Sequence, residues 1–159
     1  MIWFMIAACG IALDQLTKWW AAATLSAGAV QALIPGFIDF RYHVNTGAAW
    51  SFLAGHSWGI HLLSLVSLLA SILFAIGIIR LKDRRIRFCL ALILGGAVGN
   101  LLDRTFRQGV IDFISVSFGD YYFPIFNVAD MLLVIGLVLA IVFLLFTDSK
   151  KLLSSDVKK

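Results

Sequence analysis

Two aspartates occupy apolar surroundings in the second half of the chain. Asp112 lies inside the apolar run 110–114, and Asp130 precedes a long apolar stretch, three residues after Asn127. A single acid at a helix start usually serves as a partner for the helix dipole, but two carboxylates in one partly dry site push their pKa values apart. The ionised one can take a proton from water while the protonated one polarises a peptide carbonyl. If both side chains reach the same place, the pair predicts amide hydrolysis without a metal or a covalent intermediate.

Further ionisable side chains lie where lipid would make each of them cost about 2.5–3.5 kcal/mol. Asp14 and Lys18 stand four residues apart, so on a helix they share one face and can pair. Such a pair either neutralises itself, with the lysine reaching toward the interface, or lines a polar pocket, and a supporting role is the favoured interpretation. Asn100, Asp103 and Arg104 are three and four residues apart, so they share one helix face. Asp103 and Arg104 could serve only to cap and anchor the helix end, but three such groups beside a glycine-lined face predict a polar cavity between helices.

Small residues mark two further segments. Gly95 and Gly99 form a small-xxx-small pattern, which predicts a tight helix contact. The segment 45–50 (NTGAAW) places an asparagine beside small residues that let a backbone approach something closely. Taken alone, this segment is interpreted as an ordinary turn into a short interfacial helix anchored by Trp50.

Other hydrolytic chemistries fit the residues less well. The chain has no glutamate, and His43, His56 and His61 form no His-Glu-x-x-His pair, so neither a zinc site nor any other metal or cofactor is predicted. Cys9 and Cys89 have no histidine or acid at helical spacing, which argues against a thiol nucleophile. Both cysteines are predicted to be unpaired small hydrophobic residues. No serine stands in a nucleophile-elbow context.

The elements that must position these residues are predicted to be membrane spans. Hydrophobic residues make up 61% of the 159 positions and charged residues only 14%, with a mean hydropathy of +0.95. A soluble domain of this size has fewer apolar residues. Because a span needs about 20 apolar residues, the sequence predicts four spans, and we expect the first to be retained and not cleaved as a signal peptide. Their approximate bounds are 2–23, 58–79, 86–102 and 128–146.

Basic residues orient the predicted bundle. Five Lys or Arg residues lie at positions 80–87 and four more at 150–159, both at the ends of apolar runs. The positive-inside rule places these segments, and therefore both termini, in the cytoplasm. The same placement makes nucleic-acid binding, the usual rival explanation for a high isoelectric point, the weaker interpretation. The connections 24–57 and 103–127 then lie on the outer face of the membrane.

Both outer connections contain strand patterns. Segment 37–44 partly alternates apolar and polar residues, and segment 110–116 is rich in β-branched residues. A small sheet lying against the outer membrane surface follows. The predicted fold is a single domain over residues 1–159, an all-α membrane protein with a four-helix bundle and this small β-structure, and its chemistry should lie near the outer leaflet.

From the residues alone, three classes of function stay open. An aspartic peptidase explains the paired acids. A small transporter or channel subunit could use buried Asp and Arg to bind ions or protons, although the acids gather at one outer rim instead of the midplane. A non-catalytic assembly protein leaves the costly polar groups unexplained.

The motifs taken together resemble those of the bacterial lipoprotein signal peptidase (signal peptidase II) family of membrane aspartic peptidases over nearly the full chain. The matching blocks, in order, are 14–18 (DQLTK), 45–49 (NTGAA), 95–104 (GGAVGNLLDR), 110–113 (VIDF) and 126–130 (FNVAD). Any one block is a weak signal, but five in the right order in a four-span chain are specific.

The resemblance implies a role for each matched residue. The catalytic pair falls on Asp112 and Asp130. Positions that shape the site or hold the substrate fall on Asn45, Gly47, Asn100, Arg104 and Asn127. Positions with supporting, largely structural roles fall on Asp14, Lys18 and Asp103.

The resemblance also implies substrates, inhibitors and a fold. The substrate would be a prolipoprotein whose lipobox cysteine carries diacylglycerol, cut just before that cysteine, and globomycin would inhibit the enzyme. Membrane lipids would be its other partners, and we expect a monomer in the bacterial inner membrane. The fold would be a four-helix bundle with an outer β-cradle and a short outer helix. Trp50 stands where the family usually has phenylalanine, and the amino terminus lacks a basic residue.

Overall fold

The computed structural model describes residues 1–26, 28–47 and 58–146. Within these residues the chain forms four long helices and a small sheet. The elements in chain order are α1 (Ile2–Leu25), β1 (Val30–Ile34), β2 (Ile38–Asn45), α2 (Gly59–Arg80), α3 (Arg84–Arg107), β3 (Val110–Phe118), β4 (Tyr121–Tyr122) and α4 (Val128–Leu145).

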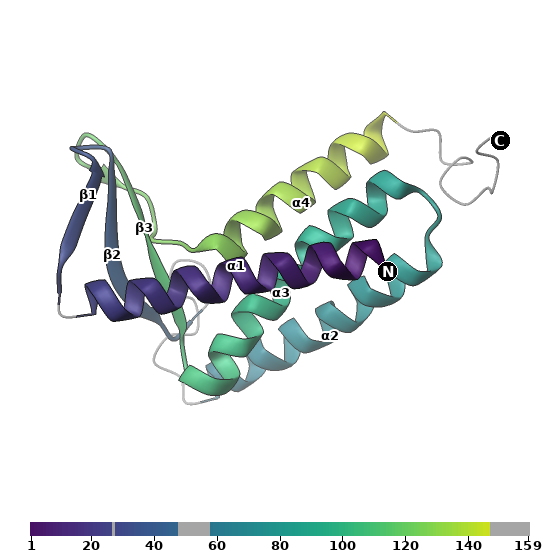
Figure 1. The fold of residues 1–159 in the computed structure, drawn as a ribbon, viewed down its shortest axis with the longest axis horizontal. Helices are drawn as coiled ribbons and strands as arrows, with labels where there is room; N and C mark the ends of the chain where they lie inside the picture. Colours follow the sequence, from purple (N-terminus) through teal and green to yellow (C-terminus); the bar gives the residue numbers. More distant parts are fainter. Residues whose placement is uncertain (27, 48–57, 147–159) are drawn as a thin grey trace.

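Helix α3 lies at the centre of the bundle and packs against the other three helices. The sheet covers one end of the bundle, whereas the start of α1, the α2–α3 connection and the end of α4 lie at the opposite end (Figure 1). The connection that carries the basic residues 80–87 is therefore as far from the sheet as the bundle allows.

Glycines on α3 allow its neighbours to approach closely. A methyl group added at Gly95 would lie 3.1 Å from the backbone oxygen of Ala7 on α1, and one at Gly96 would strike the backbone oxygen of Ala129 on α4. At Gly99 the added carbon would lie 2.6 Å from a carboxylate oxygen of Asp14. The predicted tight contact at the glycine pair on α3 is confirmed, and it extends to two neighbouring helices.

The sheet is antiparallel with strand order β1-β2-β3-β4. Its inner strand β3 joins the carboxyl end of α1 in one apolar cluster, in which Ile111 and Phe113 pack with Ala21 and Leu25. Because these side chains are buried on one face of β3, the strand register is fixed against α1. Asp112 is thereby held between two anchored apolar residues.

The predicted spans correspond to the four helices, with one correction. The third span, expected over 86–102, is a helix that runs over Arg84–Arg107. The last turns of the helix carry polar residues, so the apolar pattern ends before the helix does. The helix can continue because these polar side chains form hydrogen bonds and ion pairs within the protein. The helix begins at the side chain of Asp83, which accepts a hydrogen bond from the backbone N–H of Arg85 at 2.8 Å, and ends at Gln108 in a left-handed conformation.

Both predicted strands are confirmed as β2 and β3, whereas β1 and β4 were not predicted. The five residues of β1 are all exposed, and β4 has two residues, so neither carries the alternation that marks a half-buried strand. The predicted interfacial helix with Trp50 lies outside the described residues. Cys9 and Cys89 are both free, as predicted.

Among the helices of the described ranges, three have the length and composition of membrane spans, namely α2, α3 and α4, with mean hydropathies of 2.7, 1.6 and 2.9. Only 11% of the α2 and α4 windows is buried within the protein, against 61% for α3. The outer faces of α2 and α4 are therefore apolar and free to contact lipid, whereas α3 is enclosed. Helix α1 has comparable length but carries the fully buried Asp14 and Lys18.

Candidate active site

Asp112 lies on β3 opposite His43 of β2 and is 3% exposed. Each of its carboxylate oxygens accepts a hydrogen bond from an asparagine amide. Asn127 Nδ2 donates to Oδ1 at 2.6 Å, and Asn45 Nδ2 donates to Oδ2 at 3.1 Å. The orientation of the Asn45 amide is fixed in turn, since its Oδ1 accepts from the backbone N–H of Gly47 at 2.9 Å.

Asp130 lies in the first turn of α4. Asn127 caps this helix, with its Oδ1 accepting from the Asp130 backbone N–H at 3.0 Å, while its own backbone N–H donates to Asp130 Oδ2 at 3.2 Å. This reciprocal arrangement is a capping box. The other carboxylate oxygen of Asp130 accepts from Asn100 Nδ2 on α3 at 2.8 Å.

Asn127 links the two aspartates directly. Its amide nitrogen binds Asp112 while its amide oxygen and backbone bind Asp130, and the side chain is fully buried. The helix cap that starts α4 therefore also sets where Asp130 lies relative to β3. We call Asp112 and Asp130 the aspartate pair.

The electrostatics of the site favour a proton on Asp112. The pKa of Asp112 is raised to about 6, mainly by burial and also by the nearby charge of Asp130. The hydrogen bonds from Asn45 and Asn127 and the charge of Lys18 act in the opposite direction and lower the pKa, but they do not cancel the rise. Asp130 occupies the amino-terminal end of α4, where the helix dipole favours a negative charge. The pair can thus hold one proton up to about pH 6.

Both aspartates line a single cavity of about 690 Å³. Its polar wall also includes His43, Asn45, Asn100 and Arg104. The remaining wall is apolar and comes mostly from residues 123–126 before α4 and from Met131, Leu133, Val134 and Ile135 on α4, together with Val110 of β3. The cavity therefore has carboxylates on one side and a surface suited to an apolar chain on the other.

The three polar residues near the end of α3 separate into two environments. Asn100 and Arg104 line the cavity, where Arg104 Nη1 donates to Ser67 Oγ on α2 at 3.3 Å. Asp103 instead points toward α1 and is fully buried. The prediction that all three share one face toward a cavity is correct for Asn100 and Arg104 and wrong for Asp103. Asp103 and Arg104 are successive residues, about 100° apart around the helix, so they lie on either side of Asn100 and face different neighbours.

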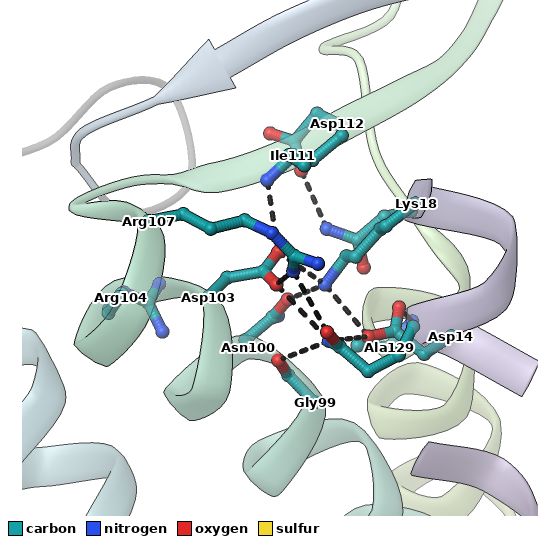
Figure 2. Close-up of polar contacts among 12 residues, drawn as sticks. Asp14, Lys18, Gly99, Asn100, Asp103, Arg104, Arg107, Ile111, Asp112 and Ala129 are labelled. Atoms are coloured by element: carbon teal, nitrogen blue, oxygen red, sulfur yellow. Dashed lines mark hydrogen bonds and ion pairs between the residues drawn. The ribbon is translucent and has the colours of Figure 1, made fainter. Parts of the chain in front are cut away.

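Behind the aspartate pair lies a buried cluster of charges, which we call the ion cluster and define as Asp14, Lys18 and Asp103. Lys18 Nζ lies 2.9 Å from Asp14 Oδ2 and 3.0 Å from Asp103 Oδ2, and all three side chains are fully buried. Figure 2 shows Lys18 reaching into the middle of this cluster, with Arg104 to one side of it. The predicted pairing of Asp14 with Lys18 is confirmed, and Asp103 is its third member.

Several residues around the site were not predicted. Arg107 pairs with Asp103 and donates to Gln15 Oε1 at 2.8 Å. Gln15 Nε2 lies 3.1 Å from both Asp14 and Asp103. The spacing of four between Asp103 and Arg107 was a usable signal, whereas the cavity position of His43 depends on strand pairing. Among the described residues, no three His, Cys, Asp or Glu side chains gather as metal ligands.

Comparison with known proteins decides the family. The family model for signal peptidase (SPase) II matches residues 6–146. The chain belongs to the signal peptidase II family. It is therefore a peptidase and a multi-pass protein of the bacterial inner membrane.

Individual relatives agree with this family over nearly their full length. The lipoprotein signal peptidases of Listeria welshimeri and Bacillus pumilus are each 42% identical over 151 residues, which is 95% of this chain and 97% and 96% of theirs. A solved bacterial membrane enzyme, determined by the in meso method at 2.3 Å resolution, is 33% identical with a TM-score of 0.82 and covers 99% of this chain and 94% of its own. A second such enzyme, at 1.9 Å, is 34% identical with a TM-score of 0.74, covering 92% of this chain and 94% of its own.

Proposed function

We propose that this signal peptidase II family member removes the signal peptide from diacylglyceryl-modified prolipoproteins, cleaving before the lipidated lipobox cysteine as an intramembrane aspartic endopeptidase. The observation that carries this proposal is the aspartate pair, two acids from different elements joined through Asn127 in one cavity. An amide hydrolase of this type needs no group beyond the two carboxylates and a water molecule.

In the proposed reaction Asp130 is the base and Asp112 is the acid. Ionised Asp130 takes a proton from water as the oxygen adds to the scissile carbonyl carbon, while the proton of Asp112 moves to the carbonyl oxygen. When the tetrahedral intermediate collapses, Asp130 returns its proton to the leaving amine and Asp112 regains its own. The raised pKa of Asp112 supports its role as the proton donor. We predict that the two carboxylates come within shared-proton distance when substrate binds.

The other lining residues have proposed roles in holding substrate. Asn45 and Asn100 shape the polar side of the cavity, and Arg104 offers its guanidinium to substrate carbonyl groups. Gly47 supports this side indirectly, because its backbone N–H orients the Asn45 amide. The apolar wall of α4 suits the signal peptide or the acyl chains of the modified cysteine. We expect globomycin-type inhibitors to compete for this same cavity.

We further propose that α1 is a fourth membrane span, in a monomeric protein that forms a single domain. Helix α1 has 24 residues, and its two charged side chains are fully buried and paired, so they would not face lipid. Because the basic connection 80–87 lies at the end of the bundle away from the sheet, the positive-inside rule puts both termini in the cytoplasm and the aspartate pair near the outer leaflet.

Cleavage of a diacylglyceryl-modified prolipoprotein tests the reaction. We expect wild type to cut, and folded Asp112→Asn and Asp130→Asn to lose at least about 10³-fold in rate, in line with removal of a central acid or base. Asp120→Asn is the matched control, because Asp120 is exposed in the turn between β3 and β4. Retention of most activity by either pair variant would show the assignment to be wrong. If folded wild type does not cut, the proposed substrate and cleavage site are wrong.

Single-cysteine labelling tests the orientation. In a Cys9→Ser, Cys89→Ser background, an impermeant maleimide applied to intact cells should label Asp120→Cys at the sheet end. It should label Lys82→Cys, in the α2–α3 connection, only after the membrane is permeabilised. The reverse pattern would place the aspartate pair near the inner leaflet and refute the proposed topology.

A further inference from the structure

The ammonium group of Lys18 has three hydrogen-bonding partners. Its Nζ lies 2.9 Å from Asp14 Oδ2, 3.0 Å from Asp103 Oδ2 and 2.9 Å from Asn100 Oδ1. An ammonium group has three donors, and the side chain is fully buried. Every donor of this lysine therefore goes to a partner on α1 or α3.

Each aspartate partner of Lys18 also holds one backbone group beside the aspartate pair. Asp14 Oδ1 accepts from the backbone N–H of Ala129 at 2.8 Å, and Ala129 directly precedes Asp130. Asp103 Oδ2 accepts from the backbone N–H of Ile111 at 3.1 Å, and Ile111 directly precedes Asp112. Figure 2 shows Ile111 and Ala129 on opposite sides of the ion cluster.

The third partner of Lys18 contacts the aspartate pair itself. Because Asn100 Oδ1 accepts from Lys18, its amide must turn Nδ2 the other way, and Nδ2 donates to Asp130 Oδ1 at 2.8 Å. If the Lys18 side chain were replaced by one without a donor, the Asn100 amide could rotate and present its oxygen to the carboxylate of Asp130. Lys18 thus ensures that Asn100 presents its amide N–H, and not its amide oxygen, to the carboxylate of Asp130.

We propose that Lys18 is a positioning residue for catalysis, which fixes both members of the aspartate pair through Asp14, Asp103 and Asn100. The inference rests on the proposed function and deepens it. Two buried carboxylates anchor the residues before the aspartates on β3 and α4, and one cation holds those carboxylates together. The ion cluster therefore sets the relative placement of β3 and α4 in addition to satisfying its own charges.

A purely structural ion pair behaves differently from a positioning one. A buried pair that only satisfies itself can often be replaced by neutral residues without loss, and activity should then follow the folded fraction. A positioning pair should lose kcat in a protein that remains folded and still binds substrate, because displacement of a reacting group by about 1 Å can cost about 10²-fold.

The main test is the charge-balanced double variant Lys18→Met with Asp14→Asn. It removes one positive and one negative charge, leaves Asp103 paired with Arg107, and keeps an amide oxygen that can accept from Ala129. We expect folded protein whose KM for diacylglyceryl-modified prolipoprotein stays within about threefold while kcat falls about 30- to 100-fold. The matched control, Arg85→Met with Asp83→Asn, deletes an ion pair of 3.0 Å at the far end of α3 and should leave both constants unchanged.

A second pair of variants decides the matter even if the double variant fails to fold. Asp103→Asn retains an acceptor for the Ile111 N–H, whereas Asp103→Leu, of similar size, does not. We expect Asp103→Leu to lose at least about tenfold more kcat than Asp103→Asn at similar KM, a magnitude typical of supporting residues behind a reactive group.

The outcomes separate this inference from the proposed function. If wild type does not cleave the substrate, the proposed function fails first. If wild type cleaves but the folded double variant keeps kcat within about threefold, or the two Asp103 variants lose kcat equally, the positioning role of Lys18 is refuted while the aspartate pair stands.

Discussion

Replacement of Asp112 by asparagine should stabilise the protein while it abolishes catalysis. Burial and the charge of Asp130 raise the pKa of Asp112 from 3.8 to about 6. About two pKa units correspond to about 3 kcal/mol. Because the folded state binds this proton more tightly than the unfolded state does, the free energy of unfolding falls as pH rises from about 4 to about 6. Above that window the wild-type protein carries the full cost of an ionised Asp112.

Asparagine removes the charge but keeps only one acceptor. The amide oxygen can still accept from Asn45 or Asn127, whereas the amide nitrogen would face the second donor, a loss of about 1 kcal/mol. The net gain for Asp112→Asn is therefore about 1–2 kcal/mol at pH 8. For a chain of this size that gain raises the unfolding temperature by about 2–8 °C. Near pH 4, where wild-type Asp112 is protonated and carries no such cost, the gain should be absent and the lost acceptor should leave Asp112→Asn about 1 kcal/mol less stable than wild type.

Thermal unfolding in detergent at pH 8 and pH 4 checks this prediction, with Asp120→Asn as the control for loss of an exposed charge. We expect a gain for Asp112→Asn that is present at pH 8 and absent at pH 4. If the variant unfolds at a lower temperature than wild type at pH 8, ionised Asp112 does not destabilise the fold. The proposal that Asp112 is the protonated member of the aspartate pair then loses its physical basis.

Three further outcomes are expected. The kcat/KM of wild type should fall as pH rises through about 6 toward alkaline values, because the free enzyme then loses the Asp112 proton; a profile that is flat between pH 5 and 8 would contradict this. Asn127→Ser should keep the helix cap, and hence stability within about 1 kcal/mol, but lose activity, since serine cannot reach Asp112; equal activity in cleavage assays would remove the bridging role. Gly96→Ala should lower the free energy of unfolding by about 1–3 kcal/mol, because the added methyl meets the backbone of α4. Gly77→Ala, which meets only a side-chain methyl group at 2.8 Å, should be close to neutral in the same unfolding measurement.

The sequence predicted those features that depend on local pattern and residue chemistry. Apolar runs of sufficient length located all four helices, since the period and length of such runs follow from backbone geometry and the thickness of the bilayer. The spacing of four between Asp14 and Lys18 predicted their pairing, which the structure confirms at 2.9 Å. The order of the motifs predicted the family. Gly95 and Gly99 predicted a close helix contact, because small residues have few other reasons to recur at that spacing.

Other features could not be predicted because the sequence patterns that describe them are absent or misleading. The apolar pattern of α3 ends near residue 102, yet the helix continues to Arg107. The polar side chains of its last turns bind partners on α1 and α2, which the apolar pattern does not record. The exposed strand β1 and the two-residue β4 carry no burial alternation from which a strand could be inferred.

The sequence by itself determined which residues are available for chemistry, namely two acids in apolar segments. It also determined the helices that carry polar groups into the membrane. Only the tertiary structure decided how these residues meet. Asn127 joins the aspartates, and Lys18 lies behind both of them through contacts that span as many as 115 positions of the chain. Local periodicity fixes the direction of a side chain relative to its own helix or strand, but the distance between two elements depends on packing, here on glycines that let α3 approach α1 and α4.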